Sequence, residues 1–275
     1  MSARRRQLPA YGGQAVVEGV MMRGRQVMAI AVRAPDGQIR TRVEPLGRLY
    51  RSPLARIPFV RGIIGLWDAI VLGYKALHWS VQVQAEGEGE TLDERGMLWS
   101  SVLAFVVGIG LFMLLPAAAG QASEQGLGLS PWWGNLVEGL VRLALVVGYI
   151  AAIGLIPEVQ RLYGYHGAEH KTIHAFEHGA ALTVEGVRPF PEEHPRCGTA
   201  FLLILVLVSV VLFSLLGPMG MFARLASRIL LLPVLAGLAY EYLRFTAAHM
   251  DHPLVRVLVQ PNLWLQKLTT RPPSD

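Results

Sequence analysis

The sequence has few cysteines and few charged residues. Its one cysteine, Cys197, cannot form an intramolecular disulfide, so the disulfide framework of a small secreted protein is excluded. Charged residues make up 16% of the chain, against about a quarter in soluble proteins. Apolar residues instead account for 52% and gather in long runs. This composition predicts a membrane protein.

Four apolar runs predict four transmembrane helices. A helix needs about 20 residues to cross the hydrocarbon layer. A single segment that crosses this layer must be helical, because lipid offers the backbone no hydrogen-bond partner. The runs cover residues 98–119, 136–156, 198–216 and 226–245. We therefore expect a mainly α integral membrane protein with a four-helix transmembrane domain over residues 98–247.

The distribution of Lys and Arg predicts the orientation of these helices. Fourteen of them precede the first run, whereas none lies in residues 120–135. By the positive-inside rule, both termini and the loop of residues 158–197 should face the cytoplasm. Arg224 and Arg228, near the third loop, are a contrary signal.

The first 97 residues are predicted to form a cytoplasmic region of their own. Alternating apolar residues over 27–43 flank the turn sequence Pro-Asp-Gly, which predicts a β-hairpin. Residues 58–83 repeat apolar side chains at helical spacing and predict an amphipathic helix on the membrane surface. Partial insertion of that helix is the alternative. Residues 248–275 are expected to be a cytoplasmic tail.

Histidines are concentrated in the second predicted loop. His166, His170, His174 and His178 are spaced by four and should form one stripe on a helix. His166, Glu169 and His170 match the inverted zincin pattern H-x-x-E-H. Two imidazoles one turn apart can hold a zinc ion, and Glu169 can then act as general base. A stripe of solvated histidines on an interfacial helix is the alternative; His174 is an additional candidate ligand.

A catalytic zinc usually takes three protein ligands, so a third is needed. His194 and Glu241 are equally favoured, and Cys197 ranks below them. Glu241 lies in a predicted membrane helix, where a carboxylate is costly and indicates function. Pairing with Arg244 or Arg228 is the structural alternative. Lys171 could stabilise an oxyanion, although a solvated lysine is the usual outcome on a helix surface.

A second unusual segment is the glycine-rich stretch GGQAVVEGVMMRG at residues 12–24. Glycines allow tight turns and close backbone approach. Glu18 and Arg23 within it could face a site. The stretch lacks the phosphate-loop pattern, and a lead-in to the hairpin is the simpler interpretation.

Three motifs together resemble one known family. GGQAVVEGVMMRG, YHGAEHKTIHAFE and HPRCGT occur in this order and are similar to the YqhQ-like family of bacterial membrane proteins. That family is a domain of unknown function whose members are labelled predicted metal-dependent enzymes. The resemblance implies a bacterial cell (inner) membrane location and a divalent metal ion, but supplies no substrate. It covers the following motif residues: Gln14, Glu18, Arg23, His166, Glu169, His170, Lys171, His194, Arg196 and Cys197.

Three function classes remain open at this point. The first is a zinc-type hydrolase at the cytoplasmic membrane face, acting on a lipid, a lipid-linked molecule or a membrane peptide. The second is a di-iron lipid oxidase built on histidine boxes. The third is a non-enzymatic membrane scaffold or assembly factor. Membrane lipid is the expected partner, and nucleic acid is not, because anionic headgroups account for the N-terminal arginines.

Overall fold

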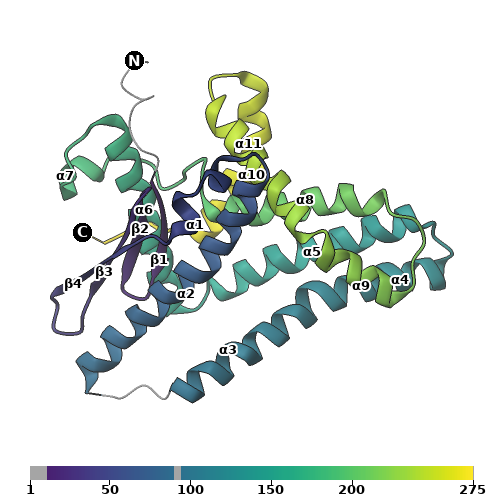
Figure 1. The fold of residues 1–275 in the computed structure, drawn as a ribbon, viewed down its shortest axis with the longest axis horizontal. Coiled ribbons are helices and arrows are strands. Elements are labelled where there is room, and N and C mark those ends of the chain that lie inside the picture. Colours follow the sequence, from purple (N-terminus) through teal and green to yellow (C-terminus); the bar gives the residue numbers. More distant parts are fainter. Residues whose placement is uncertain (1–10, 90–93, 275) are drawn as a thin grey trace.

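The computed structural model describes residues 11–89 and 94–274 of the chain. The described part is mainly helical, with an antiparallel sheet near the N-terminus. In Figure 1 the sheet lies at one end of the molecule, and the apolar helices extend from it toward the other end.

The sheet has four antiparallel strands in sequence order: β1 (Gly12–Val16), β2 (Gly19–Arg23), β3 (Val27–Arg33) and β4 (Ile39–Pro45). The predicted hairpin is confirmed as β3 and β4. Gly37 in its turn has a φ of 82°, a left-handed conformation that glycine adopts without strain. The glycine-rich stretch is more than a lead-in, because it forms the second hairpin, β1 and β2.

One long helix covers the sheet. After the short turns α1 (Arg48–Arg51) and η1 (Pro53–Arg56), α2 spans Val60–Glu88 and packs Leu72 and Ala76 against the sheet. Its opposite face exposes apolar residues such as Trp67. The predicted helix is thus confirmed, and its place on a membrane surface stays a prediction. The described helices that are apolar enough to cross a membrane do not include α2.

The first two predicted membrane helices are present. α3 (Glu94–Ile109), the π-turn η2 (Gly110–Leu114) and α4 (Leu115–Leu127) form one continuous helix, and α5 spans Pro131–Ile153. Pro116 explains the π-turn, because it lacks the N–H that would bond to the Phe112 carbonyl. Arg142 of α5 replaces that donor, with its Nε 3.1 Å from Phe112 O.

The last two predicted membrane helices are shorter or broken. α8 (Gly198–Ser214) is apolar but has 17 residues. The predicted helix over 226–245 is not continuous: α9 (Met221–Leu230) and α10 (Leu232–Ala248) meet at an angle of 46°. Pro233 causes the break, because its ring clashes with the preceding helical turn. The described residues therefore contain two helices that could cross a membrane, or three if α9 and α10 count as one; four is not confirmed.

Helix α9 is inverted relative to a soluble amphipathic helix. Phe222 and Leu230 are 86% and 75% exposed, whereas Arg224 and Arg228 are only 2% and 5% exposed. Both arginines point inward to Glu138 of α5, with the Arg228 Nη2 2.7 Å from its carboxylate. An apolar exterior over buried, paired charges suits lipid rather than water. These pairs also account for the contrary arginines of the third loop.

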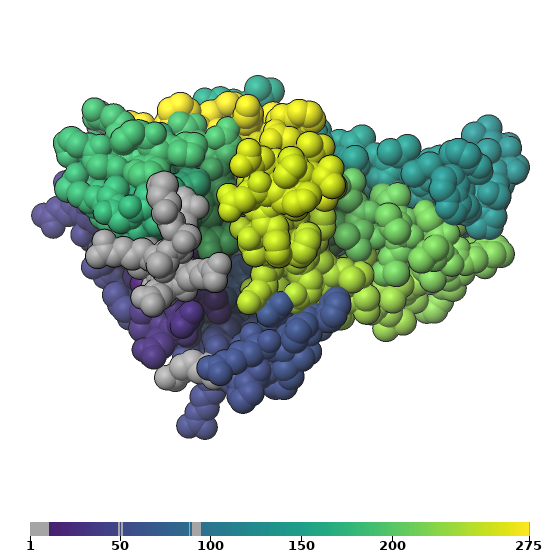
Figure 2. All heavy atoms as spheres, turned by 90° about the horizontal axis from the view of Figure 1, so that it is seen from above, coloured from purple at the N-terminus to yellow at the C-terminus, as the bar shows by residue number. Residues whose placement is uncertain are grey.

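The histidine segment and the C-terminal segment meet at the sheet end of the molecule. α6 spans Pro157–His178 and is followed by the short α7 (Val184–Val187). The predicted tail is instead mostly helical: α11 (Pro253–Thr269) packs Leu265 against α5 and α8. Beyond α11, the Arg271 amide donates to the Tyr163 carbonyl of α6 over 3.0 Å. Figure 2 shows α10 and α11 beside the α6–α7 region.

Candidate metal centre

Helix α6 carries the histidine stripe on a rigid support. Pro157 begins the helix and Gly179 ends it with a φ of 71°, both typical of helix ends. One side of α6 packs against β1 and β2. Its histidines instead face residues 188–197 and the start of α8.

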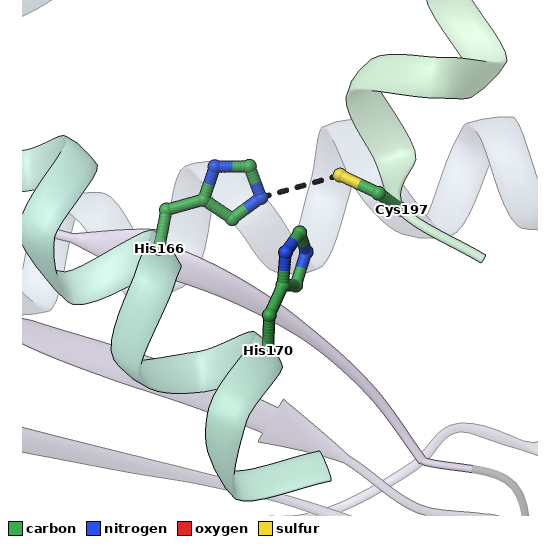
Figure 3. Close-up of side chains that lie close together, drawn as sticks. All are labelled: His166, His170 and Cys197. Atoms are coloured by element: carbon green, nitrogen blue, oxygen red, sulfur yellow. Dashed lines mark hydrogen bonds between the residues drawn. The ribbon is translucent and has the colours of Figure 1, made fainter. Parts of the chain in front are cut away.

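The first group of metal-type side chains comprises His166, His170 and Cys197. One donor atom from each lies within 4.8 Å of the other two. Both rings project from α6 toward the sulfur at the start of α8 (Figure 3), and His166 Nε2 is 3.2 Å from Cys197 Sγ. Zinc bonds of about 2.1 and 2.3 Å at the tetrahedral angle place nitrogen and sulfur roughly 3.5 Å apart. The group is therefore compact enough to share one ion.

Backbone carbonyls fix the orientation of both rings. His166 donates its Nδ1–H to the Thr269 carbonyl at the end of α11, over 2.8 Å. His170 donates its Nδ1–H to the Glu192 carbonyl. A carbonyl can only accept, so each neutral ring keeps its lone pair on Nε2, the nitrogen that is free to bind an ion. Metal-binding histidines usually have such a second partner.

Cys197 occupies the N-cap position of α8 and is 5% exposed. Its sulfur accepts a hydrogen bond from the Thr199 amide and lies 3.0 Å from the Thr199 hydroxyl. Burial alone would raise the pKa of the thiol, but the His170 side chain and the hydrogen bonds with Thr199 outweigh it, and the pKa of Cys197 falls below its ordinary value. The thiolate is the form that binds metals.

Glu169 is buried beside this group, at 5% exposure. Its side chain fits against β1 because Gly13 has no Cβ: a Cβ there would lie 2.5 Å from Glu169 Oε1. Burial raises the pKa of Glu169 to about 8; His166 opposes this rise and Cys197 adds to it. The carboxyl group is thus within electrostatic reach of two of the three metal-type residues.

A second group lies next along α6 and comprises His174, Glu177 and His194. His194 Nε2 is 3.5 Å from Glu177 Oε2, and Arg196 pairs with the other carboxylate oxygen. Burial lowers the pKa of both histidines to about 4, so both rings are neutral near pH 7. Glu177 was not predicted, although it stands one turn from His174 on the same stripe and could have been found by that spacing.

Lys171 anchors the segment that follows α7. Its Nζ donates to the carbonyls of Arg188 and Phe190, over 3.0 and 2.6 Å. The ammonium group is therefore occupied by backbone, which fixes the loop carrying Glu192 and Cys197. The proposed oxyanion role has no support in these contacts.

Glu241 lies outside both groups. Its carboxylate pairs with Arg61 of α2, whose Nε is 2.7 Å away, and it accepts from the Phe59 amide. The sequence indicated Arg244 as the partner of Glu241. It could not indicate Arg61, because the α2–α10 crossing is a long-range contact. The structure thus brings Cys197, the lowest-ranked candidate, to His166 and His170 in place of Glu241.

The polar residues of the glycine-rich motif connect the sheet to its neighbouring helices. Glu18 pairs with Arg161 and Tyr165 of α6, and Arg23 pairs with Asp68 of α2. The Gln14 amide group lies against α2, where a Cβ on Gly73 would come within 2.4 Å of it. These three residues position the sheet. Gly13 of this motif contacts Glu169, which lies beside the first group.

Comparisons with known proteins agree with the resemblance noted above. Residues 57–275 match the family described as "Protein of unknown function (DUF1385)". The chain is 34% identical over 283 residues to "Uncharacterized protein YqhQ" of Bacillus subtilis (strain 168), an alignment that covers 97% of this chain and 88% of that protein. No solved structure matches the chain. The chain belongs to the DUF1385 family.

Proposed function

We propose that this DUF1385 family member is a metal-dependent hydrolase of the bacterial cell membrane, with one divalent ion, zinc by preference, held by His166, His170 and Cys197. One observation carries the proposal. Two imidazole Nε2 atoms and one thiol converge, and each ring already donates its other N–H to a backbone carbonyl. Two nitrogens and a sulfur are typical zinc ligands.

The membrane part of the proposal is supported by the apolar helices and by the inverted α9. We take α3–α4, α5, α8 and the bent pair α9–α10 as four crossings, with α8 reaching about 25 Å at 1.5 Å per residue. Four crossings leave both termini on the cytoplasmic side. They also leave α6 and Cys197 on that side, at the membrane face.

Three protein ligands leave a fourth position open to water or substrate, as in catalytic zinc sites. A divalent ion in the group would supply Lewis acidity toward a carbonyl or phosphoryl oxygen. Glu169 would accept the proton of the attacking water. A neighbouring cation lowers the pKa of a buried carboxyl group and so favours the carboxylate form that this role needs.

The first experiment is a metal analysis of the purified full-length protein. We expect Cys197→Ala, and the double variant His166→Ala/His170→Ala, each to lose one bound ion per chain. His252→Ala removes an exposed histidine outside both groups and should lose none. A wild-type protein without any bound ion would refute the proposed centre. Iron in place of zinc would favour the di-iron oxidase instead.

A second experiment separates an enzyme from a scaffold. Glu169→Gln keeps the shape of a buried side chain and removes only its proton-accepting ability. In a deletion strain with a growth phenotype, this variant should fail to complement while its level in the membrane stays normal. Full complementation would show that no proton transfer by Glu169 is needed, and the scaffold function would then be preferred.

Substrate choice rests on where the group lies. Cys197 begins an apolar helix, and His166 is held by the end of α11, which exposes Leu254, Val257 and Trp264. A substrate reaching this group from the bilayer would be a lipid, a lipid-linked molecule or a membrane peptide. A soluble substrate would gain nothing from these exposed apolar side chains.

A further inference from the structure

We infer that a second divalent ion binds at His174, Glu177 and His194, directly beside the first group. The inference concerns a separate set of ligands and does not depend on the hydrolase proposal. It gives a role to polar side chains beside the histidine stripe that are not part of the first group.

The spacing of the donor atoms is the first argument. One donor from each of the three residues lies within 4.8 Å of the others. The distance of 3.5 Å between His194 Nε2 and Glu177 Oε2 is too long for a hydrogen bond to a carboxylate, which is usually about 2.7–2.9 Å. It matches two ligands on one tetrahedral zinc, which lie roughly 3.4 Å apart.

An unsatisfied buried nitrogen is the second argument. His194 is 3% exposed, and its Nε2 makes no hydrogen bond with any described residue. Leaving such a group without a partner destabilises the folded protein. An ion between His194 and Glu177 would satisfy this nitrogen, and the ring is neutral, as a ligand must be.

The surroundings of the group also resemble those of metal ligands. Glu177 is paired through its other oxygen with Arg196, and His174 Nε2 donates to the Glu193 carbonyl over 2.9 Å. Ligating carboxylates and imidazoles usually have such outer partners. One contact competes: the Arg196 amide donates to His194 Nδ1 over 3.3 Å, which places the proton of the neutral ring on Nε2, so that an ion would have to displace this proton. That arrangement is a histidine–glutamate pair that binds no ion.

The position of the second group indicates a structural ion. The ring centroids of His170 and His194 are 5.8 Å apart, so the two groups are neighbours with separate ligands. A second ion would tie α6 to the loop that carries Glu192 and Cys197, in addition to the bonds that His170 and Lys171 already make to that loop. Two imidazoles and a carboxylate accept zinc and related divalent ions.

The test counts zinc ions in the full-length protein after chelation and reloading with zinc alone. We expect two per chain in the wild type, one in Glu177→Gln and one in Cys197→Ala. Glu185→Gln, an exposed carboxylate on α7, is the matched control and should keep two. One zinc in the wild type, unchanged in Glu177→Gln, would overturn the inference and establish the histidine–glutamate pair.

Cobalt(II) distinguishes failure of this inference from failure of the first site or of folding. Only the first group contains a thiolate, so only it should give a sulfur-to-cobalt charge-transfer band. Glu177→Gln should keep that band while binding one cobalt fewer. If the wild type binds one cobalt that Glu177→Gln retains, and no band forms in the wild type, both assignments are wrong. If Glu177→Gln loses one ion and Cys197→Ala loses none, the second site stands and the hydrolase centre fails.

Discussion

Replacing Glu169 with glutamine should stabilise the metal-free protein, and the gain should grow with pH. Burial raises the pKa of Glu169 from 4.5 to about 8. The folded protein therefore holds a proton that the unfolded chain releases between these two values. The free energy of unfolding must then fall as pH rises from 4.5 to 8 and level off above it. Below 4.5 both states are protonated and the carboxyl group contributes no difference.

The size of the effect follows from the two pKa values. Each pKa unit corresponds to about 1.4 kcal/mol, so the full interval amounts to up to about 5 kcal/mol. Glutamine does not titrate and escapes this loss. The stability gap between Glu169→Gln and wild type should be small at pH 5 and reach its maximum near pH 8.

The assay is thermal unfolding in detergent, after chelation, at one-unit steps from pH 5 to 9. Glu158→Gln removes an exposed carboxylate from the same helix, and its difference from wild type should not change with pH in this way. A constant gap between Glu169→Gln and wild type across the series, or a less stable variant at pH 8, would refute the argument. Adding zinc should narrow the gap, because a cation favours the carboxylate.

Three further predictions concern packing and ion pairs. Gly13→Ala should cost about 1–3 kcal/mol by overpacking against Glu169, and Glu169→Ala should relieve much of that cost in a double-mutant cycle of melting temperatures. Glu18 has a φ of 53°, so Glu18→Ala should be about 1 kcal/mol less stable than Glu18→Gly, since both lose the Arg161 pair and only alanine keeps the left-handed strain. Glu138→Leu leaves buried arginines unpaired and should cost about 3–5 kcal/mol, seen as a lower melting temperature and a smaller monodisperse fraction in detergent.

Local signals predicted most of the secondary structure. The hairpin at residues 27–43 and the helix at 58–83 follow from alternation and helical spacing, and both are present. The β1–β2 hairpin was missed because glycines interrupt the alternation of apolar side chains, as at Gly19, which is buried on the same face of β2 as Met21. The broken fourth helix was also missed, although Pro233 stands in the sequence. Apolar content alone does not report a proline break.

The part of the candidate site that lies on one helix could be predicted from the sequence. The spacing of His166 and His170 needs only a helical turn. The proposed third ligand, Cys197, lies at the N-cap of another helix, so its identity depends on tertiary packing that no local pattern encodes. Glu241 satisfied the rule that charges in membrane helices are functional, yet its function is to neutralise Arg61. The same rule failed to identify the larger network around Glu138, because Arg224 was placed in the third loop and Arg228 at the start of the fourth helix.

The choice of Cys197 over Glu241 has a consequence for how the centre is assembled. The residues of the first group are held by three helices. The histidine rings lie on α6, which directly follows α5, and the sulfur lies at the N-cap of α8. The carbonyl partner of His166 lies at the end of α11. The side chains of α5, α8 and α11 share one apolar core. A change in the packing of these helices must therefore shift the three donors relative to one another. The geometry of the proposed metal centre is thus tied to the apolar helices, whereas the sheet meets α6 beside it where Gly13 contacts Glu169.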